Sequence, residues 1–399
     1  MGSPQRAYPV VHVTGTNGKG STTRMVASLL AAVGLNAGAY TSPHLERLNE
    51  RLSISGQPID DDQLASQLAA LAELERFLSI KPTWFELMTA AAFRWFADEA
   101  VEAAVIEVGL GGRYDATNVA EAAVAVVTNV DLDHTEILGK TRQLIASEKA
   151  GIIKPGSVAV IGEPDDEIAA IFEAEAAAVG AASCWRRGRD FGADELRLAV
   201  GGRAAELWTP AARYEEVFLP VRGSYQCDNA AAALAAVQAF VGEVLPDDVV
   251  REGFSSLRLP GRMEVLARQP LLVLDGAHNA AGTAAAGEAL AEDFSSARRI
   301  VLVMGCLRNR SARELLEGLA DERLAHVVAC RPPSPRAQPA GAVAEAAREM
   351  GICASVVEEV GEAVEEARRL AGPDDLVLVT GSLYVVGAAR SLYEASRPA

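Results

Sequence analysis

Residues 8–21 read YPVVHVTGTNGKGS and decide the fold of the first half of the chain. The apolar run at residues 8–13 has the composition of a buried strand, and the loop after it carries glycines, Lys19 and Ser21. Glycines let backbone N–H groups turn toward an anion, and a lysine adds a mobile positive charge. Apolar residues recur at helical spacing over residues 19–33, so a helix should follow the loop. This order of elements predicts a site for the phosphates of ATP or a related nucleotide.

The spacing within the loop differs from the common G-x-x-x-x-G-K-[ST] pattern. Only two residues separate Gly15 from Gly18, and Gly20 stands between Lys19 and Ser21. A glycine-rich turn without phosphate chemistry is therefore the alternative interpretation. The succession of strand, glycines, lysine and helix favours nucleotide binding over that alternative.

The composition restricts the class of protein. Half of the 399 residues are apolar, which is enough for a substantial core, and the length favours two or more domains. The net charge of −17 argues against a nucleic-acid surface or a polybasic membrane patch. The five cysteines are scattered, so we expect neither a disulfide framework nor a zinc knuckle, and a reducing cytoplasm as the location. We find no apolar signal region and no stretch able to span a bilayer.

Strand-like and helix-like segments alternate along the chain, which predicts an α/β fold with parallel sheets covered by helices on both faces. The expected helices beyond the first are residues 61–78, 83–97, 141–152, 166–179, 225–240 and 247–257. The expected strands are residues 37–40, 103–108, 124–130, 158–161, 271–274, 300–304, 326–329 and 376–379. Residues 183–219 break this rhythm and predict a small antiparallel excursion.

Proline and glycine at positions 260 and 261 suggest a joint between domains. We therefore expect two domains. The first, residues 1–258, is a nucleotide-binding domain built on a parallel sheet with the phosphate-binding loop. The second, residues 259–399, is a smaller, Rossmann-like α/β domain.

Four of the five histidines lie at or beside the ends of expected strands, where open α/β sheets bind ligands. These four are His12, His44, His134 and His278. Any one of them taken singly could be a hydrogen-bonded structural histidine. Their joint placement favours a functional edge of the sheet.

Glu107 interrupts an otherwise apolar strand, where an unpaired carboxylate is costly. It is either an edge-strand glutamate or a Mg²⁺ ligand beside the triphosphate, because Mg²⁺ takes a few protein oxygens together with phosphates and water. Asp131, Asp133 and His134 end the next strand and could bring a second metal ion or a catalytic group to the same edge. Lys149, read alone, is a surface charge.

Taken together, a series of segments resembles the Mur ligase superfamily, and closely its folylpolyglutamate synthase/dihydrofolate synthase branch. The segments cover nearly the whole chain in order, and their combination is highly specific. They are VHVTGTNGKGS (11–21), TSPHL (41–45), NER (49–51), VIEVGLGGRYDATN (105–118), LDHT (132–135), EKAGII (148–153), Asn229, PGR (260–262), DGAHN (275–279) and TGS (380–382).

The resemblance implies an ATP-dependent ligase acting through an acyl phosphate. ATP would phosphorylate a substrate carboxylate, and the amine of L-glutamate would then displace the phosphate. The acceptor would be dihydropteroate, a reduced folate or both, and the enzyme would be a monomer. A Mur-type amide ligase for a non-folate carboxylate and a non-catalytic ATP-binding relative are the alternatives.

The resemblance also implies roles for single residues. ATP would contact Asn17, Gly18, Lys19, Gly20, Ser21, Asn229, Arg262 and Asp275. A first Mg²⁺ would be bound by Ser42 and Glu107 and a second by His134, with Lys149 carbamylated so that it becomes an anionic oxygen donor. The catalytic groups would be Lys19, Lys149, His134 and His278, the last near the transferred phosphate. Pterin contacts would come from Thr83, Trp84, Phe85, Glu86, Tyr114, Asp115 and Ala116, for which helix packing and a strand-end turn are the alternative.

The chain departs from the family pattern in two places. Relatives usually carry a longer segment before the phosphate-binding loop, so a truncated folate ligase and a ligase for a different acceptor both fit. Relatives also carry an acidic–basic–acidic triplet in the second domain, where this chain has Arg308, Asn309 and Arg310. The contacts of that loop are therefore left open.

Overall fold

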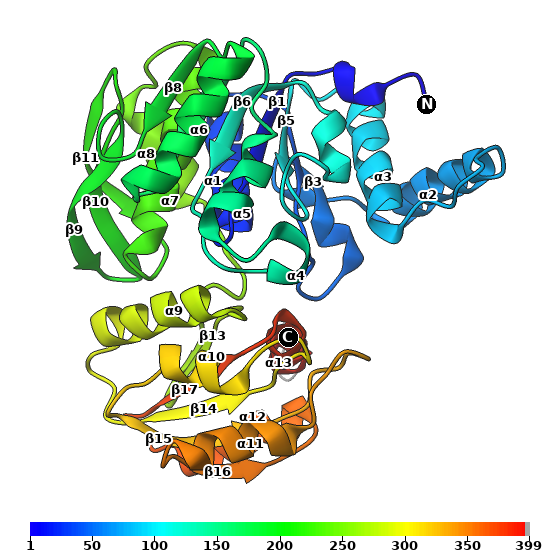
Figure 1. The fold of residues 1–399 in the computed structure, drawn as a ribbon. Helices are drawn as coiled ribbons and strands as arrows, with labels where there is room; N and C mark the ends of the chain where they lie inside the picture. Colours follow the sequence, from blue (N-terminus) through cyan, green and yellow to red (C-terminus); the bar gives the residue numbers. More distant parts are fainter. Residues whose placement is uncertain (396–399) are drawn as a thin grey trace. The chain divides into compact units, whose positions relative to one another are not determined.

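The computed structural model describes residues 1–395 and divides into two compact units. Unit 1 comprises residues 1–220 and 226–257, and unit 2 comprises residues 221–225 and the chain from residue 258 onward. Both units are α/β with largely parallel sheets (Figure 1), which confirms the predicted fold class.

The main sheet of unit 1 has the strand order β4-β3-β2-β5-β1-β6-β7-β8. Its strands are β1 (Val10–Thr14), β2 (Ala37–Tyr40), β3 (Leu52–Ile54), β4 (Gln57–Pro58), β5 (Ala103–Glu107), β6 (Ala122–Val127), β7 (Val158–Ile161) and β8 (Ser183–Arg186). β1 lies in the interior and pairs in parallel with β5 on one side and β6 on the other. The loops that leave the carboxyl ends of these three strands therefore meet at one edge of the sheet.

Helices cover both faces of this sheet (Figure 1). The helices of unit 1 are α1 (Lys19–Ala32), α2 (Asp61–Glu75), α3 (Trp84–Asp98), α4 (Thr135–Leu138), α5 (Arg142–Ala150), α6 (Asp166–Val179), α7 (Tyr225–Val241) and α8 (Asp247–Ser255). One core joins α3 to β1, β2 and β5, and another joins α5 and α6 to β6 and β7. Val10 belongs to the core under α3, so strand alternation turns Val11 and Val13 to the opposite face, where α1 packs.

The predicted antiparallel excursion is wrong at its start. Residues 183–186 form β8, which pairs in parallel with β7 and extends the main sheet. Only β9 (Gly192–Ala199), β10 (Gly202–Trp208) and β11 (Arg213–Leu219) form a separate antiparallel sheet. Because α6 returns the chain to the free edge of β7, β8 completes one more strand–helix–strand unit, a pairing that the local sequence does not reveal.

Two predicted elements end three residues earlier than expected. The helix predicted to reach residue 78 ends at Glu75, and the strand predicted to reach residue 130 ends at Val127. The strand ends there because Thr128 turns toward the phosphate-binding loop, where its hydroxyl donates to the Asn17 carbonyl over 2.6 Å. The carbonyl of Asn129, the next residue, accepts the Thr16 backbone N–H over 2.9 Å, so the chain after Val127 bonds to the loop.

His12 lies inside β1 and is completely buried, so its expected place at a strand end is wrong. Its Nε2 lies 2.8 Å from the Thr117 hydroxyl at the start of the short helix η3 (Ala116–Val119). Burial lowers the pKa of His12 to about 3, with a smaller contribution from the positive charge of Lys154. His12 is therefore a neutral structural histidine at ordinary pH.

Unit 2 has one sheet with the order β12-β13-β17-β14-β15-β16, in which β12 is antiparallel to β13 and the rest are parallel. The strands are β12 (Glu264–Arg268), β13 (Leu271–Leu274), β14 (Ile300–Met304), β15 (Leu324–Ala329), β16 (Cys353–Val356) and β17 (Leu376–Thr380). The helices are α9 (Ala280–Asp293), α10 (Ala312–Gly318), α11 (Ala340–Glu349), α12 (Val360–Leu370) and α13 (Leu383–Ala395). β12 and β16 had not been predicted.

The core of unit 2 lies under α9, α10 and α11 on one face of the sheet. α12 and α13 contact each other and the central strand β17, and α12 also contacts β14. The chain returns from β16 to β17 through α12, and a right-handed crossover in that direction places α12 on the opposite face. Within residues 1–395, no helix has the length and apolar character needed to cross a membrane.

Candidate functional site

The phosphate-binding loop runs from the end of β1 at Thr14 to the start of α1 at Lys19. Gly18 precedes the helix in the left-handed region, with φ of +83°, which glycine adopts without strain. A Cβ on Gly18 would lie only 2.6 Å from Oδ1 of Asn229, so this side chain from α7 rests directly on the loop. Two residues predicted to contact ATP, more than 200 positions apart in sequence, are therefore in contact.

Two lysines converge on the same carbonyl group of the loop. Lys19 Nζ donates to the carbonyl oxygens of Gly15 and Thr16, each over 3.0 Å, and Lys149 Nζ donates to that of Gly15 over 2.7 Å. Lys149 is only 3% exposed, which makes its reading as a surface charge wrong. Burial, and then the like charge of Lys19, lower the pKa of Lys149 well below its ordinary value. A buried amine with a lowered pKa is also a nucleophilic one.

Glu107 ends β5, which lies between β2 and β1, so the alternative of an edge-strand glutamate is wrong. Its carboxylate is 3% exposed and accepts the backbone N–H of Ser42 over 2.8 Å. A Cβ on Gly20 would lie 3.4 Å from Glu107 Oε2, so the carboxylate faces the first turn of α1. Ser42, Glu107 and the phosphate-binding loop therefore lie together at the carboxyl edge of the sheet.

His134 precedes α4 with a positive φ of 49°, and its side chain is 37% exposed. Its Nε2 lies 3.8 Å from Oδ1 of Asp133, which also accepts the His134 backbone N–H over 2.8 Å. Among residues 1–395, no three His, Cys, Asp or Glu side chains are grouped closely enough to bind a metal ion by themselves. Mg²⁺ at this edge would thus need few protein ligands, such as Glu107, and oxygens from phosphate and water, which is its usual preference.

The segment after β6 braces the phosphate-binding loop, a role that the sequence analysis missed. Asn129 accepts the Thr16 backbone N–H at its carbonyl and the Asn17 backbone N–H at its side-chain oxygen, both over 2.9 Å. Asp131 and Thr16 are linked twice, through the Asp131 N–H over 2.9 Å and the Asp131 carbonyl over 3.1 Å. The available signal was positional, because β6 is the parallel neighbour of β1.

The predicted acceptor-binding residues at the start of α3 have structural partners. Thr83 and Glu86 form a capping box, in which the Glu86 carboxylate accepts the Thr83 backbone N–H over 2.6 Å. Phe85 packs against Gly109, whose Cβ position would lie 2.3 Å from the ring. Trp84 is 50% exposed, with the Arg51 guanidinium 4.6 Å from its ring centre. Of the two aromatic residues, Trp84 is exposed and Phe85 is partly buried, so Trp84 offers the more accessible ring for stacking.

The predicted acceptor contacts after β5 also divide by exposure. Tyr114 is 87% exposed. Asp115 caps η3 and accepts the backbone N–H groups of Leu110 and Thr117 over 2.8 and 3.0 Å. Ala116 is the first residue of η3. The turn therefore holds an exposed aromatic ring on a fixed backbone.

In unit 2, the predicted ATP contacts gather at the carboxyl end of β13. Asp275 is 4% exposed and accepts the backbone N–H groups of Met263 and Ala277, both over 2.9 Å. Burial raises the pKa of Asp275, and the nearby Arg262 guanidinium opposes that rise. A Cβ on Gly276 would lie 2.7 Å from Arg262 Nη1, and His278 Nδ1 lies 2.8 Å from the Gly276 carbonyl.

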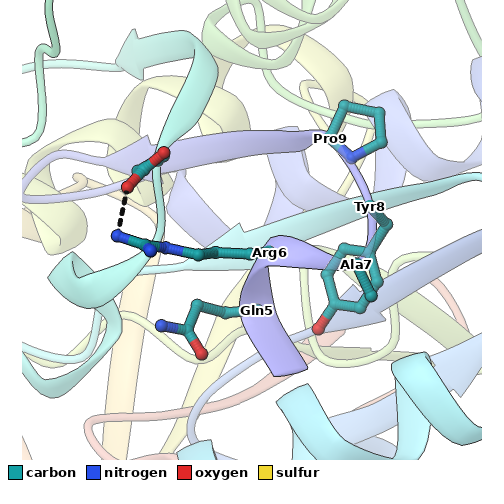
Figure 2. Close-up of a pocket in the computed structure, with 6 residues that line it drawn as sticks. Gln5, Arg6, Ala7, Tyr8 and Pro9 are labelled. Carbon is teal, nitrogen blue, oxygen red and sulfur yellow. Dashed lines mark hydrogen bonds and ion pairs between the residues drawn. The ribbon is translucent and has the colours of Figure 1, made fainter. Parts of the chain in front are cut away.

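A surface pocket near the amino terminus lies away from these residues. Gln5, Arg6, Ala7, Tyr8, Pro9 and Glu121 line it (Figure 2), and Arg6 pairs with Glu121 over 2.8 Å. It opens beside the first residue of β1, whereas the phosphate-binding loop follows the last. The opposite ends of one strand thus separate this pocket from the candidate site.

Comparison with known proteins agrees with this geometry. Residues 13–237 match the family model of the Mur ligase middle domain, and residues 261–383 match that of the Mur ligase glutamate ligase domain. The fold, the phosphate-binding loop and these matches define the class of protein as a Mur ligase.

Individual relatives narrow the class further. The dihydrofolate synthase/folylpolyglutamate synthase of Mycobacterium tuberculosis is 37% identical over 98% of this chain and 88% of its own length. A crystal structure of the M. tuberculosis folylpolyglutamate synthase with ADP and AMPPCP matches with a TM-score of 0.93 and 38% identity, covering 100% of this chain and 93% of that one. A bifunctional folylpolyglutamate synthase/dihydrofolate synthase with Mn, AMPPNP and L-glutamate bound matches with a TM-score of 0.85 and 32% identity, covering 98% and 91%. The chain belongs to the folylpolyglutamate synthase/dihydrofolate synthase family of Mur ligases.

Proposed function

We propose that this chain is an ATP-dependent ligase that adds L-glutamate to dihydropteroate, to reduced folates or to both, and that it acts as a monomer. The observation that carries the proposal is the convergence of Lys19, Lys149, Glu107 and Asn229 on one glycine-rich loop. Membership of the family and its relatives' nucleotide complexes support the same activity.

The proposed reaction has two steps. A carboxylate oxygen of the acceptor attacks the γ-phosphorus of ATP, and the bond to the bridging oxygen breaks to release ADP and leave an acyl phosphate. The amine nitrogen of L-glutamate then attacks the acyl carbon, loses a proton and expels phosphate. Both steps move negative charge between oxygens, so alignment and charge neutralisation are what the protein must supply.

The residues of the loop are suited to that task. Backbone N–H groups over residues 18–21, at the start of α1, would face the phosphates, and Lys19 would balance their charge. Asn229, Arg262 and Asp275 complete the proposed contacts to ATP, with His278 near the transferred phosphate. Trp84 and Tyr114 offer exposed rings to the pterin, while Thr83, Phe85, Glu86, Asp115 and Ala116 hold those rings in place.

Mg²⁺ bound to the nucleotide would screen the charge of the phosphates during transfer. We propose Ser42 and Glu107 as protein ligands of one ion and His134 as a ligand of a second. The carboxylate of Glu107 is buried at the carboxyl end of β5, and a cation there would offset the cost of burying its charge.

We propose that Lys149 is carbamylated in the active enzyme. Its lowered pKa keeps part of the amine neutral, and a neutral amine combines with CO₂ to give a carbamate and one released proton. The product carries a negative charge and two oxygen donors, which suits a position beside Lys19 and the bound cation better than an ammonium does.

The test is glutamate-dependent ADP release by the purified chain with ATP and Mg²⁺, with dihydropteroate, tetrahydrofolate or no acceptor. Release that requires both glutamate and a pteroate compound supports the proposal, and the preferred acceptor separates the two synthase activities. If the chain binds ATP but neither dihydropteroate nor tetrahydrofolate supports ADP release, the folate assignment is contradicted. A ligase for another carboxylate is then favoured.

A further inference from the structure

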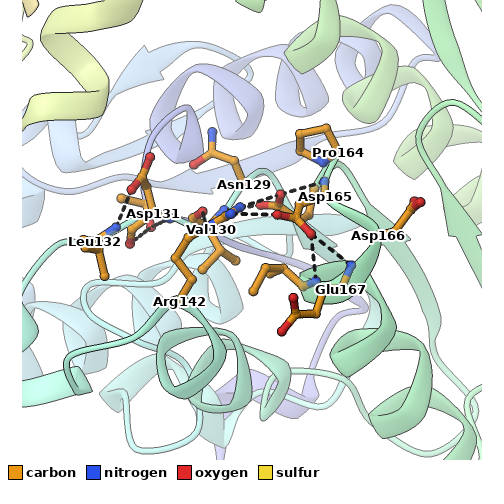
Figure 3. A network of polar contacts seen from close by, with 12 residues as sticks. Asn129, Val130, Asp131, Leu132, Arg142, Pro164, Asp165, Asp166 and Glu167 are labelled. Atoms are coloured by element: carbon orange, nitrogen blue, oxygen red, sulfur yellow. Dashed lines mark hydrogen bonds and ion pairs between the residues drawn. The ribbon is translucent and has the colours of Figure 1, made fainter.

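One polar network behind the candidate site has no part in the function described so far. It links Arg142, the first residue of α5, to Glu163 and Asp165 after β7 (Figure 3). Arg142 donates to Glu163 over 2.9 Å and to Asp165 over 2.8 Å. Glu163 is only 1% exposed, so the carboxylate at the centre of the network is removed from water.

The centre of this network is the backbone of a single residue, Val130. Its N–H donates to the Glu163 carboxylate over 2.6 Å, and its carbonyl accepts from Arg142 Nε over 3.0 Å. Both polar groups of one peptide segment are therefore held by an ion pair whose members also hold each other. Hydrogen bonds to charged groups are among the stronger ones in proteins, and burial reduces the competition from water for the bonding groups.

Val130 stands between the two residues that brace the phosphate-binding loop. Asn129 holds the backbone N–H groups of Thr16 and Asn17, and Asp131 is linked twice to Thr16. A shift of Val130 would move both braces together. The position of the loop is thereby tied to the Arg142–Glu163 pair, although neither side chain bonds to the loop.

The same helix reaches the loop by a second route. Arg142 begins α5 and Lys149 lies seven residues later, two turns along the same face, where its Nζ meets the Gly15 carbonyl. The arginine fixes one end of α5 through Val130, and the lysine contacts the loop from the other end. Anchoring the first turn of α5 therefore also fixes where Lys149 stands.

We infer that Arg142 and Glu163 are positioning residues for nucleotide binding. They act through Val130 to hold the phosphate-binding loop and Lys149 in the positions that nucleotide binding requires. This inference rests on the proposed nucleotide site. It adds a role for a pair of residues that the reaction itself does not touch.

The test measures the dissociation constant of ADP with Mg²⁺, and KM for ATP against kcat, in wild-type protein and variants. Arg142→Met keeps an unbranched side chain and removes the three hydrogen bonds to Val130, Glu163 and Asp165. Because the Arg142 side chain is 33% exposed, the substitution leaves the surrounding core intact. We expect ADP binding about tenfold weaker, from the lost hold on two loop contacts, with KM for ATP raised more than kcat is lowered. Arg142→Lys keeps the charge beside Glu163 without the fork that reaches three acceptors, so it should restore only part of the affinity.

A matched control is available in unit 2. Arg299 pairs with the buried Asp375 over 2.6 Å, and Asp375 also accepts the Gly372 backbone N–H over 2.8 Å. This pair precedes β14 and β17, at the amino ends of their strands. Arg299→Met should therefore lower the melting temperature as a lost ion pair does, and leave the affinity for ADP unchanged.

A double variant decides whether Arg142 acts through the brace. If it does, Asn129→Ala should weaken ADP binding less in the Arg142→Met background than in the wild type. Wild-type affinity in Arg142→Met, an equal loss in Arg299→Met, or losses that simply multiply in the double variant would each overturn the inference. Glu163→Gln gives a second approach and should weaken ADP binding in the same direction. A wild-type chain that does not bind ADP would overturn the proposed function, and this inference with it.

Discussion

Replacing Gly18 by alanine tests the contact between the phosphate-binding loop and α7. Gly18 has φ of +83°, and an added Cβ would lie 2.6 Å from Oδ1 and 3.2 Å from Cγ of Asn229. Asn229 is 7% exposed and donates to Gln226 Oε1 over 2.9 Å, so it cannot move aside without breaking that bond. The substitution therefore strains the backbone and also displaces a residue proposed to contact ATP.

The magnitude follows from two contributions. A left-handed backbone costs a residue with a Cβ about 1–2 kcal/mol. Overpacking against a buried side chain adds about 1–3 kcal/mol. We therefore expect Gly18→Ala to lower the free energy of unfolding of unit 1 by about 2–5 kcal/mol in total.

The matched control lies just beyond the other end of the same helix. Gly34 also has a positive φ, of +95°, but a Cβ there would meet no atom within 4 Å. Gly34→Ala should therefore lose only the backbone contribution of about 1–2 kcal/mol. The difference between the two variants isolates the collision with Asn229.

The assays are urea unfolding of both variants and calorimetric titration with ADP and Mg²⁺. Gly18→Ala should bind ADP at least about tenfold more weakly, because the N–H groups of the loop and Asn229 both move, whereas Gly34→Ala should bind as the wild type does. Equal losses of stability in the two variants, together with unchanged ADP binding in Gly18→Ala, would refute the reasoning.

Three further predictions concern buried titratable residues of unit 1. Lys149→Ala should abolish ligation, and a small carboxylate such as formate should partly restore it by replacing the carbamate; full activity without the additive would contradict that role. Glu107→Gln keeps an acceptor for the Ser42 N–H but loses the charge, so the Mg²⁺ concentration for half-maximal activity should rise about tenfold or more, and an unchanged titration would rule out Glu107 as a ligand. Because the pKa of His12 falls from 6.5 to about 3 on folding, the unfolded chain binds a proton that the folded chain does not between these values, and stability should be lost as the pH falls through this window, by at most about 1.4 kcal/mol per pH unit. His12→Gln should flatten that loss in urea unfolding between pH 4 and 7, and an unchanged slope would show that His12 is not its source.

Much of unit 1 could be predicted because its signals are local. The strand, glycine-rich loop and helix that form the phosphate-binding site are contiguous, and the chemistry of glycine and lysine fixes what such a loop can hold. β7 and α6 have the predicted boundaries, since short apolar runs and helical periodicity are properties of neighbouring residues. The motifs were also sufficient to identify the family.

Contacts between distant segments could not be predicted in this way. Lys149 read alone was a surface charge, and only the packing of α5 shows that it is buried on the Gly15 carbonyl. His12 looked like an edge residue until the pairing of β1 with β5 and β6 placed it in the core. Asn129 carried no signal of its own.

The sequence alone determined that this chain has a nucleotide-binding loop, two α/β halves and the motifs of a glutamate ligase family. Only the tertiary structure decided that Glu107 stands on an interior strand, that Asn229 rests on Gly18, and that Val130 is held by Arg142 and Glu163. The physical reason is that backbone conformation follows from adjacent residues, whereas burial and hydrogen bonding depend on which strands lie side by side. That order is set by the packing of the whole sheet, and no single segment of the chain contains it.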